Sequence, residues 1–316
     1  YTEWQTLRRY PILNWNMGMT YRLRESDERI YPQGELGRRT IGLTGDRGNY
    51  GIEAVYREEL AGRDGRATRQ RIARGFYGRV VDGDNIDPID GLDVVTTLDL
   101  DVQDVANRYL REQLEAQNAI WGTTIVMEVR TGEILALVNL GRTPGGGYAE
   151  RENYAIGRNT EPGSTFKLAS MLLLLDDADM PLDQTYDTGN GRVVKVGGIR
   201  VQDSHAGFND MDFRTAVAQS SNVYFAKAIW ERYADNKERY SDFMKKLHLD
   251  QTVGLEAFGE KKPLFQDWKE VPDPNSMLVR RSFGYRIKLS PIQVITLYNA
   301  IANDGKENAR NVKPAS

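Results

Sequence analysis

The chain has 316 residues, of which 40% are hydrophobic and 28% charged, the profile of a folded globular protein with one or two domains. Its 42 Lys and Arg against 45 Asp and Glu give a formal net charge of -3, which lacks the positive excess that nucleic-acid phosphates require and excludes nucleic acid as a partner. The absence of cysteine and the presence of only two histidines, His205 and His248, exclude thiol nucleophiles, disulfides, iron–sulfur clusters and most transition-metal sites, so any catalysis uses Ser, Lys, Asp, Glu or Tyr.

Residues 1–118 contain many charges and scattered glycines, with only short apolar pieces such as Ile41–Leu43 and Ile52–Val55. This pattern predicts short strands and turns with little independent core. The β-rich run Gly91–Leu98 follows, and then a helix is expected from Asp99 or Asp101 because apolar residues recur there at a spacing of 3.6. We therefore expect an extended accessory domain over 1–118, with this helix as a hinge into a second domain over 119–316.

The second domain begins with two apolar runs, Thr124–Val129 and Ile134–Val138, around a turn that contains glycine, which predicts a β-hairpin. The residues after Ser164 predict an apolar helix over Leu168–Leu175. Further helices are expected at Phe213–Gln219, Val223–Tyr233 and Pro291–Asn303, and the last has Ser290 as N-cap, Pro291 as its first residue and Gly305 just past its end. A hairpin followed by several helices indicates the α+β class.

Ser164 and Lys167 form the first candidate catalytic pair. Residues three apart share a helix face, so the hydroxyl and the amine come within hydrogen-bond reach if a helix begins near Ser164. The apolar residues that follow would favour the neutral form of Lys167, as a general base for a serine nucleophile requires. A serine after Pro-Gly is also a good N-cap, so a purely structural role stays open.

Ser220 and Asn222 form the second candidate pair, in the sequence Gln219–Asn222 between two predicted helices. Because they are two positions apart in a tight turn, both side chains could point into a cleft. The Ser220 hydroxyl could then relay a proton, and the Asn222 amide could hold a substrate carbonyl. The alternative is that these residues only cap the helix that begins near Val223.

In this order, Glu161–Lys167 and Ser220–Val223 resemble the first two active-site motifs of the penicillin-binding transpeptidases, which share a fold with serine β-lactamases. Other segments are similar to the pedestal, the linker and a further segment of class B, monofunctional members, so that the resemblance covers nearly the whole chain: Tyr31–Leu36, Gly51–Glu53, Leu60–Gly65, Thr96–Asp99, Ser282–Tyr285 and Ser290–Gln293. Val201–His205 ahead of Ala216–Asn222 looks most like the division-specific, septal enzyme.

The resemblance implies an antiparallel sheet flanked by helices, carried on an extended β-rich pedestal. It makes Ser164 the acylated nucleophile, Lys167 its base, Ser220 a proton relay and Asn222 a contact of the substrate amide. The implied activity is peptidoglycan D,D-transpeptidation, which cross-links stem peptides without metal or organic cofactor and is blocked covalently by β-lactams. The implied setting is extracytoplasmic, with a single-pass anchor in the inner membrane and cell-division membrane proteins, including a glycan polymerase, as partners. The longest apolar run, Met171–Leu175, is far below the ~20 residues of a membrane span, so we expect the anchor to lie outside this sequence.

The family has a third motif, Lys-Thr/Ser-Gly, and no such tripeptide follows Asn222. Residues 309–316 resemble the stretch just before the strand of that motif, so we expect omitted residues between Gly305 and Ala309, a chain break between Asn303 and Arg310, and a transpeptidase domain that is incomplete at its C-terminal end. The alternative is a non-catalytic penicillin-binding scaffold or β-lactam sensor of the same fold.

Overall fold

The computed structural model describes residues 29–45, 48–67, 69–73, 76–79, 85–306 and 312–314. The chain divides into a compact unit Tyr1–Gly34 and a second unit Glu35–Ser316. In the first unit, the described residues form a turn in which Gly34 N donates to Tyr31 O at 3.0 Å. Every helix and strand of the described residues belongs to the second unit. The domain boundary expected between residues 118 and 119 lies inside this unit and stays a prediction.

The first elements of the second unit are the short helices α2 (Arg38–Ile41), α3 (Gly51–Val55) and α4 (Arg57–Ala61), followed by the antiparallel hairpin β1 (Arg69–Ala73) and β2 (Phe76–Arg79). The prediction of strands at Ile41–Leu43 and Ile52–Val55 was therefore wrong. A segment of four residues fits one helical turn as well as a strand, and Glu53 in the first turn of α3 favours the helix. Of the residues in these two runs, Leu43 alone pairs like a strand residue, with Tyr50.

The predicted helix after residue 98 is confirmed as α5 (Leu100–Ala116), with Asp99 as its N-cap. The Asp99 carboxylate accepts from the backbone N–H groups of Asp101 and Val102 at 2.9 and 3.1 Å. Just before α5, strand β3 (Val94–Thr96) pairs antiparallel with β11 (Val312–Pro314). The chain break expected between Asn303 and Arg310 stays a prediction, because residues 307–311 lie outside the described part of the chain.

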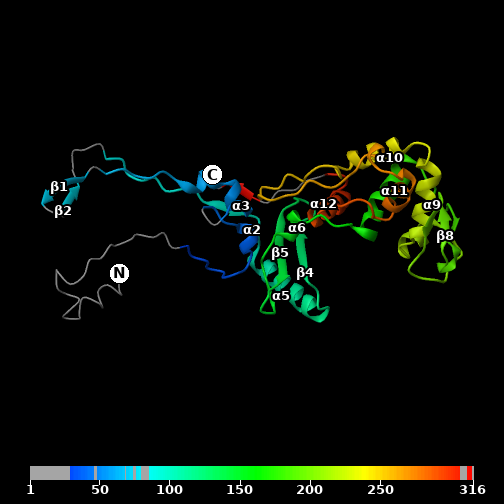
Figure 1. Ribbon diagram of the computed structural model, residues 1–316, viewed down its shortest axis with the longest axis horizontal. Helices are drawn as coiled ribbons and strands as arrows, with labels where there is room; N and C mark the ends of the chain where they lie inside the picture. The colour runs from blue at the N-terminus through cyan, green and yellow to red at the C-terminus, as the bar shows by residue number, and fades with distance from the viewer. Residues whose placement is uncertain are drawn as a thin grey trace. The chain divides into compact units, whose positions relative to one another are not determined.

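The predicted hairpin is confirmed as β4 (Trp121–Met127) and β5 (Ile134–Arg142), and β6 (Tyr148–Ala149) completes a three-stranded antiparallel sheet in the order β4-β5-β6. Figure 1 shows α5 beside β4 and β5. Alternate residues of β5 explain the layers: Ala136 and Val138 pack with α5, whereas Leu137 packs with α6 (Tyr154–Gly157) and with Ile292 of α12 (Pro291–Ala302). The start and stop signals of α12 are confirmed, with a capping box between Ser290 and Gln293.

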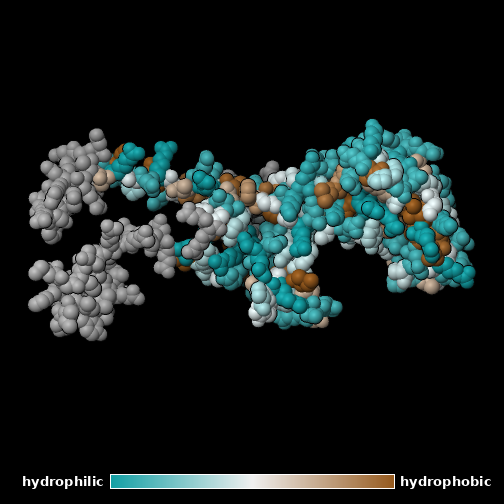
Figure 2. Space-filling model, viewed as in Figure 1, coloured by the Kyte–Doolittle hydropathy of each residue, from teal (hydrophilic) through white to brown (hydrophobic). Residues whose placement is uncertain are grey.

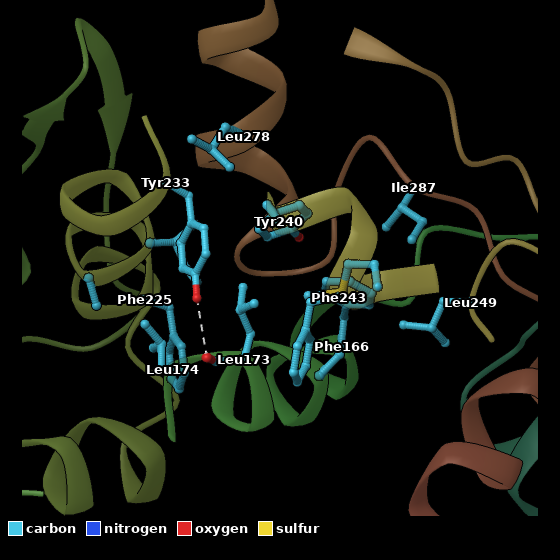
Figure 3. Close-up of a cluster of buried hydrophobic side chains, with 14 of the residues drawn as sticks. Phe166, Leu173, Leu174, Phe225, Tyr233, Tyr240, Phe243, Leu249, Leu278 and Ile287 are labelled. Atoms are coloured by element: carbon cyan, nitrogen blue, oxygen red, sulfur yellow. Dashed lines mark hydrogen bonds between the residues drawn. The ribbon is translucent and has the colours of Figure 1, made fainter. Parts of the chain in front are cut away.

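The remaining helices surround the largest hydrophobic cluster (Figure 3): η1 (Gly163–Phe166), α7 (Lys167–Leu172), η2 (Leu173–Asp177), α8 (Phe213–Ala218), α9 (Asn222–Tyr233), α10 (Lys237–Lys246) and α11 (Pro274–Arg281). Leu173 lies at its centre, and its carbonyl accepts from the Tyr233 hydroxyl at 3.3 Å. Short strands β7 (Tyr186–Asp187), β8 (Val194–Val196), β9 (Ile199–Val201) and β10 (Asp210–Met211) and helices η3 (Gly189–Gly191) and η4 (Trp268–Glu270) lie between the helices along the chain. The visible surface over α10 is mostly hydrophilic (Figure 2), which agrees with exposed Lys245 and Lys246.

Within the described part of the chain, no helix combines the length and the apolar character that crossing a membrane requires.

Candidate active site

Ser164 and Lys167 lie where a 3₁₀ turn passes into an α-helix. η1 spans Gly163–Phe166 and α7 begins at Lys167. Side chains three apart eclipse in a 3₁₀ turn, which aligns the two residues more directly than an α-helix would. Phe166 anchors the turn because its side chain is buried in the main core (Figure 3), while Ser164 stays exposed. Lys167 Nζ lies 3.2 Å from Ser164 Oγ, so the predicted contact is present.

Ser220 and Asn222 come to the same lysine from the connection between α8 and α9. Ser220 has a φ of 51°, and this left-handed residue reverses the chain between the two helices. Lys167 Nζ donates to Ser220 Oγ at 3.0 Å, to Asn222 Oδ1 at 2.7 Å, and also to Ser220 O. The cap of α9 is Ser221, whose Oγ accepts from Tyr224 N at 3.0 Å, so neither Ser220 nor Asn222 is the N-cap. The structure thus brings all four predicted residues together.

The surroundings of Lys167 favour loss of its proton. The side chain is only 4% exposed, and burial lowers the pKa of Lys167 to about 8, while the nearby Asp203 carboxylate opposes this shift. Two neighbours of Nζ, the Ser220 carbonyl and Asn222 Oδ1, can only accept, whereas the two serine hydroxyls can donate or accept. A neutral amine can therefore satisfy both acceptors with its two N–H groups and keep its lone pair for a hydroxyl proton.

Asp203 is a site residue that residue-level reasoning missed, because the sequence showed it only as part of a family-like segment. Its Oδ2 accepts from Ser221 Oγ at 2.7 Å and its Oδ1 accepts from Val223 N at 3.0 Å. The preceding carbonyl, Gln202 O, accepts from Asn222 Nδ2 at 3.1 Å, which orients the amide so that Oδ1 faces Lys167. The local sequence does not predict these contacts, since Asp203 and Ser221 are 18 positions apart.

The segment Ser282–Tyr285 packs against the turn that carries Ser164 and contacts the residues on either side of it. Gly163 N donates to Gly284 O at 3.0 Å, and Ser170 Oγ donates to Ser282 O at 2.8 Å. A Cβ on Gly284 would lie 1.9 Å from Gly163 O, so the two backbones approach as closely as only glycine permits.

A groove of about 530 Å³ opens beside Ser164 on the side of Glu161, Pro162 and Thr165. Thr123 and Ile125 of β4 and Tyr298 of α12 line its other walls. Among the described residues, β4 pairs only with β5, so its other edge faces this groove without a strand partner.

Several other chemistry-bearing residues lie outside the four-residue cluster. His205 is exposed in the loop after β9. The tripeptide Lys195–Gly197 belongs to the β8–β9 hairpin and its turn. In the described part of the chain, no group of three or more His, Cys, Asp or Glu residues has an arrangement that could hold a metal ion.

Residues 122–312 match the family model of the penicillin binding protein transpeptidase domain. The chain is 31% identical over 289 residues to the probable peptidoglycan D,D-transpeptidase PenA of Neisseria gonorrhoeae, covering 88% of this chain and 48% of that protein. It is 26% identical over 298 residues to the peptidoglycan D,D-transpeptidase FtsI of Escherichia coli, covering 90% and 47%. The chain belongs to the class B penicillin-binding proteins. It spans about half the length of these curated relatives.

Solved structures of the family have the same fold. A peptidoglycan synthetase from Bifidobacterium adolescentis superposes with a TM-score of 0.74 at 26% identity, covering 91% of this chain and 53% of that one. Penicillin binding protein 3 from Mycobacterium tuberculosis, complexed with aztreonam, gives a TM-score of 0.72 at 24% identity, covering 91% and 61%. The predicted transpeptidase fold, an antiparallel sheet with helices, is confirmed, and the pedestal stays a prediction.

Proposed function

We propose that this penicillin-binding protein is a peptidoglycan D,D-transpeptidase that works through an acyl-enzyme on Ser164. The observation that carries the proposal is the position of Lys167 Nζ, 3.2 Å from Ser164 Oγ and 3.0 Å from Ser220 Oγ. A buried amine with a lowered pKa, in contact with an exposed serine, is the arrangement that activates a hydroxyl nucleophile.

In the first step, Ser164 Oγ attacks the carbonyl carbon between the two terminal D-alanines of a stem peptide, and its proton passes to Lys167 Nζ. The carbonyl oxygen becomes an oxyanion, which backbone N–H groups at the start of η1, including that of Ser164, are suited to stabilise. The C–N bond then breaks, and the departing D-alanine takes a proton through Ser220. Asn222 would hold the amide of the donor peptide.

In the second step, an amine of a neighbouring stem attacks the ester carbon. The amine gives up a proton, the C–O bond breaks, and Ser164 Oγ recovers its proton. A β-lactam carries a strained amide that Ser164 would open in the same way, leaving a stable ester on the enzyme. No organic cofactor or metal enters either step.

We place this activity in septal cell-wall synthesis, because Val201–His205 and Ala216–Asn222 most resemble the septal enzyme. In the same proposal, residues 1–118 serve as the pedestal and linker and 119–316 belong to the transpeptidase domain. The protein would be anchored in the inner membrane with its catalytic domain in the periplasm, and would work beside cell-division membrane proteins that include a glycan polymerase.

A second candidate function is a non-catalytic penicillin-binding scaffold or β-lactam sensor. It would use the same contact between Lys167 Nζ and Ser164 Oγ, at 3.2 Å. A sensor would form the ester but would not transfer the acyl group to an amine, whereas a transpeptidase would do both. Incubation with a thioester analogue of the donor and a D-amino acid acceptor separates the two functions.

Intact-mass spectrometry with a penicillin tests the proposed nucleophile in protein made from the complete reading frame. We expect a gain of one penicilloyl group on Ser164, which Ser164→Ala abolishes. Ser204→Ala, which removes an exposed serine in the loop after β9, is the matched control and should label like the wild type. Labelling that persists in Ser164→Ala would remove Ser164 from this role.

A further inference from the structure

Seven non-glycine residues of the described chain have a positive φ, in the region that side chains with a Cβ rarely adopt. Five of them are Asn, Asp or His, the residue types enriched in this region: Asn118, Asp179, Asn190, His248 and Asp304. The other two are Ser220, at 51°, and Arg286, at 61°. Ser220 belongs to the candidate active site, and strained residues cluster at such sites. Arg286 is therefore a candidate for function on the same criterion.

The fold imposes this conformation on Arg286 through its backbone. Its N–H donates to Glu161 Oε1 at 2.9 Å, and its carbonyl accepts from Arg281 Nε at 3.2 Å. Arg281 is fully buried, and its guanidinium lies over the rings of Phe265 and Trp268, with Cζ 4.5 and 4.7 Å from the ring centres. Glycine would adopt the same φ without strain, so local stability gives no reason for an arginine here.

The backbone of Arg286 lies against the segment that leads into Ser164, and its side chain is free to meet a ligand. It is exposed, and its guanidinium makes no ion pair with any residue that the structure describes. Glu161, which holds its N–H, precedes Ser164 by three residues and lines the groove beside the serine. The exposed Lys288 adds positive charge two residues further along, while the Glu161 carboxylate offsets part of it.

We propose that Arg286 determines substrate specificity by binding a carboxylate on the acyl part of the peptide donor. This inference rests on the proposed transpeptidase function. The terminal D-alanine carboxylate is common to all donors, so a preference among donors must come from the part that stays on Ser164. A guanidinium binds a carboxylate through two parallel N–H···O bonds, which an uncharged amide cannot match. The expected substrate class is an acidic stem peptide, preferred over its amidated form.

The test compares two synthetic peptides that end in D-Ala-D-Ala and differ only in one free or amidated side-chain carboxylate. Calorimetric binding to Ser164→Ala protein avoids turnover. We expect about 10-fold tighter binding of the acid, the size of one charge-assisted hydrogen bond. Adding Arg286→Asn should abolish the preference, Arg286→Lys should retain part of it and Arg286→Glu should reverse it. Arg130→Asn, which removes an exposed arginine in the β4–β5 turn, is the charge-matched control and should leave the preference intact.

Two further measurements distinguish a role of Arg286 in specificity from a purely structural role, and test this inference separately from the proposed function. The melting temperature of Arg286→Asn should equal or exceed that of the wild type, because Asn tolerates positive φ; a marked fall would overturn the inference. Equal binding of acid and amide by Ser164→Ala protein would also overturn it. Penicillin labelling of Ser164 in the wild type tests the proposed function separately. Absence of that labelling in the wild type removes the proposed function, whereas the acid preference of the peptides is measured without it.

Discussion

Asp203 holds Ser221 by a hydrogen bond of 2.7 Å between its Oδ2 and the serine Oγ. Because the other carboxylate oxygen accepts from Val223 N, the residue fastens the segment after β9 to the first turn of α9. The same carboxylate raises the pKa of Lys167 against the effect of burial. Asp203 thus fixes the position of Asn222 and increases the basicity of Lys167, although it does not touch Ser164 in the described contacts.

Replacing Asp203 with Asn should shift the acidic limb of the acylation rate to lower pH. The negative charge favours the protonated amine, so its removal lowers the pKa of Lys167 and the neutral base forms at lower pH. The pH dependence of penicillin acylation measures the shift. Asp273→Asn, at the N-cap of α11, is the matched control because Asp273 is not among the groups that shift this pKa. A limb that stays in place in both variants would contradict the electrostatic role.

Lys167 itself should give acylation that rises with pH around an apparent pKa of about 8. Lys167→Ala should lower the acylation rate by roughly 10²–10⁴-fold, the usual range for loss of a general base, with little change in circular dichroism. Near wild-type acylation by the alanine variant would show that the amine is not the base. Since the pKa is lowered on folding from 10.5, unfolded chains bind more protons between about pH 8 and 10.5, and this group makes stability rise with pH in that window.

Glu150, which lies away from the candidate active site, should make the stability of the fold depend on pH with the opposite sign to Lys167. Burial raises its pKa to about 7, against hydrogen bonds from the backbone N–H groups of Arg39 and Asn139 that favour the carboxylate. The group should therefore make stability fall as pH rises from about 4.5 to 7. Glu150→Gln keeps an acceptor for Arg39 N and removes the charge, so it should gain roughly 1–3 kcal/mol relative to the wild type between pH 5 and pH 8. Urea unfolding at both pH values measures this. A stability difference between Glu150→Gln and the wild type that is the same at pH 5 and pH 8 would contradict the prediction.

The parts of this molecule that the sequence predicts are those with local signals. The caps of α12, the hairpin of β4 and β5, and the pairing of Ser164 with Lys167 depend on residues a few positions apart. The contacts of Asp203 and Arg286 join segments that are distant in the sequence, so the periodicity of apolar residues does not predict them. The prediction of a strand at Ile52–Val55 was wrong for another reason: four residues are too few to distinguish a helical turn from a strand.

Gly284→Ala should lower both stability and acylation, because the added Cβ would lie 1.9 Å from Gly163 O, immediately before Ser164. The φ of Gly284 is 86°, so the variant also bears backbone strain. Gly198→Ala separates the two effects, since Gly198 has a φ of 84° and no atom within 4 Å of an added Cβ. The control should lose roughly 1–2 kcal/mol of unfolding free energy and keep its acylation rate, whereas Gly284→Ala should lose more and acylate more slowly. Urea unfolding and stopped-flow acylation measure both quantities. Equal losses in the two variants, with equal acylation, would mean that the approach of Gly284 to Gly163 does not position the nucleophile.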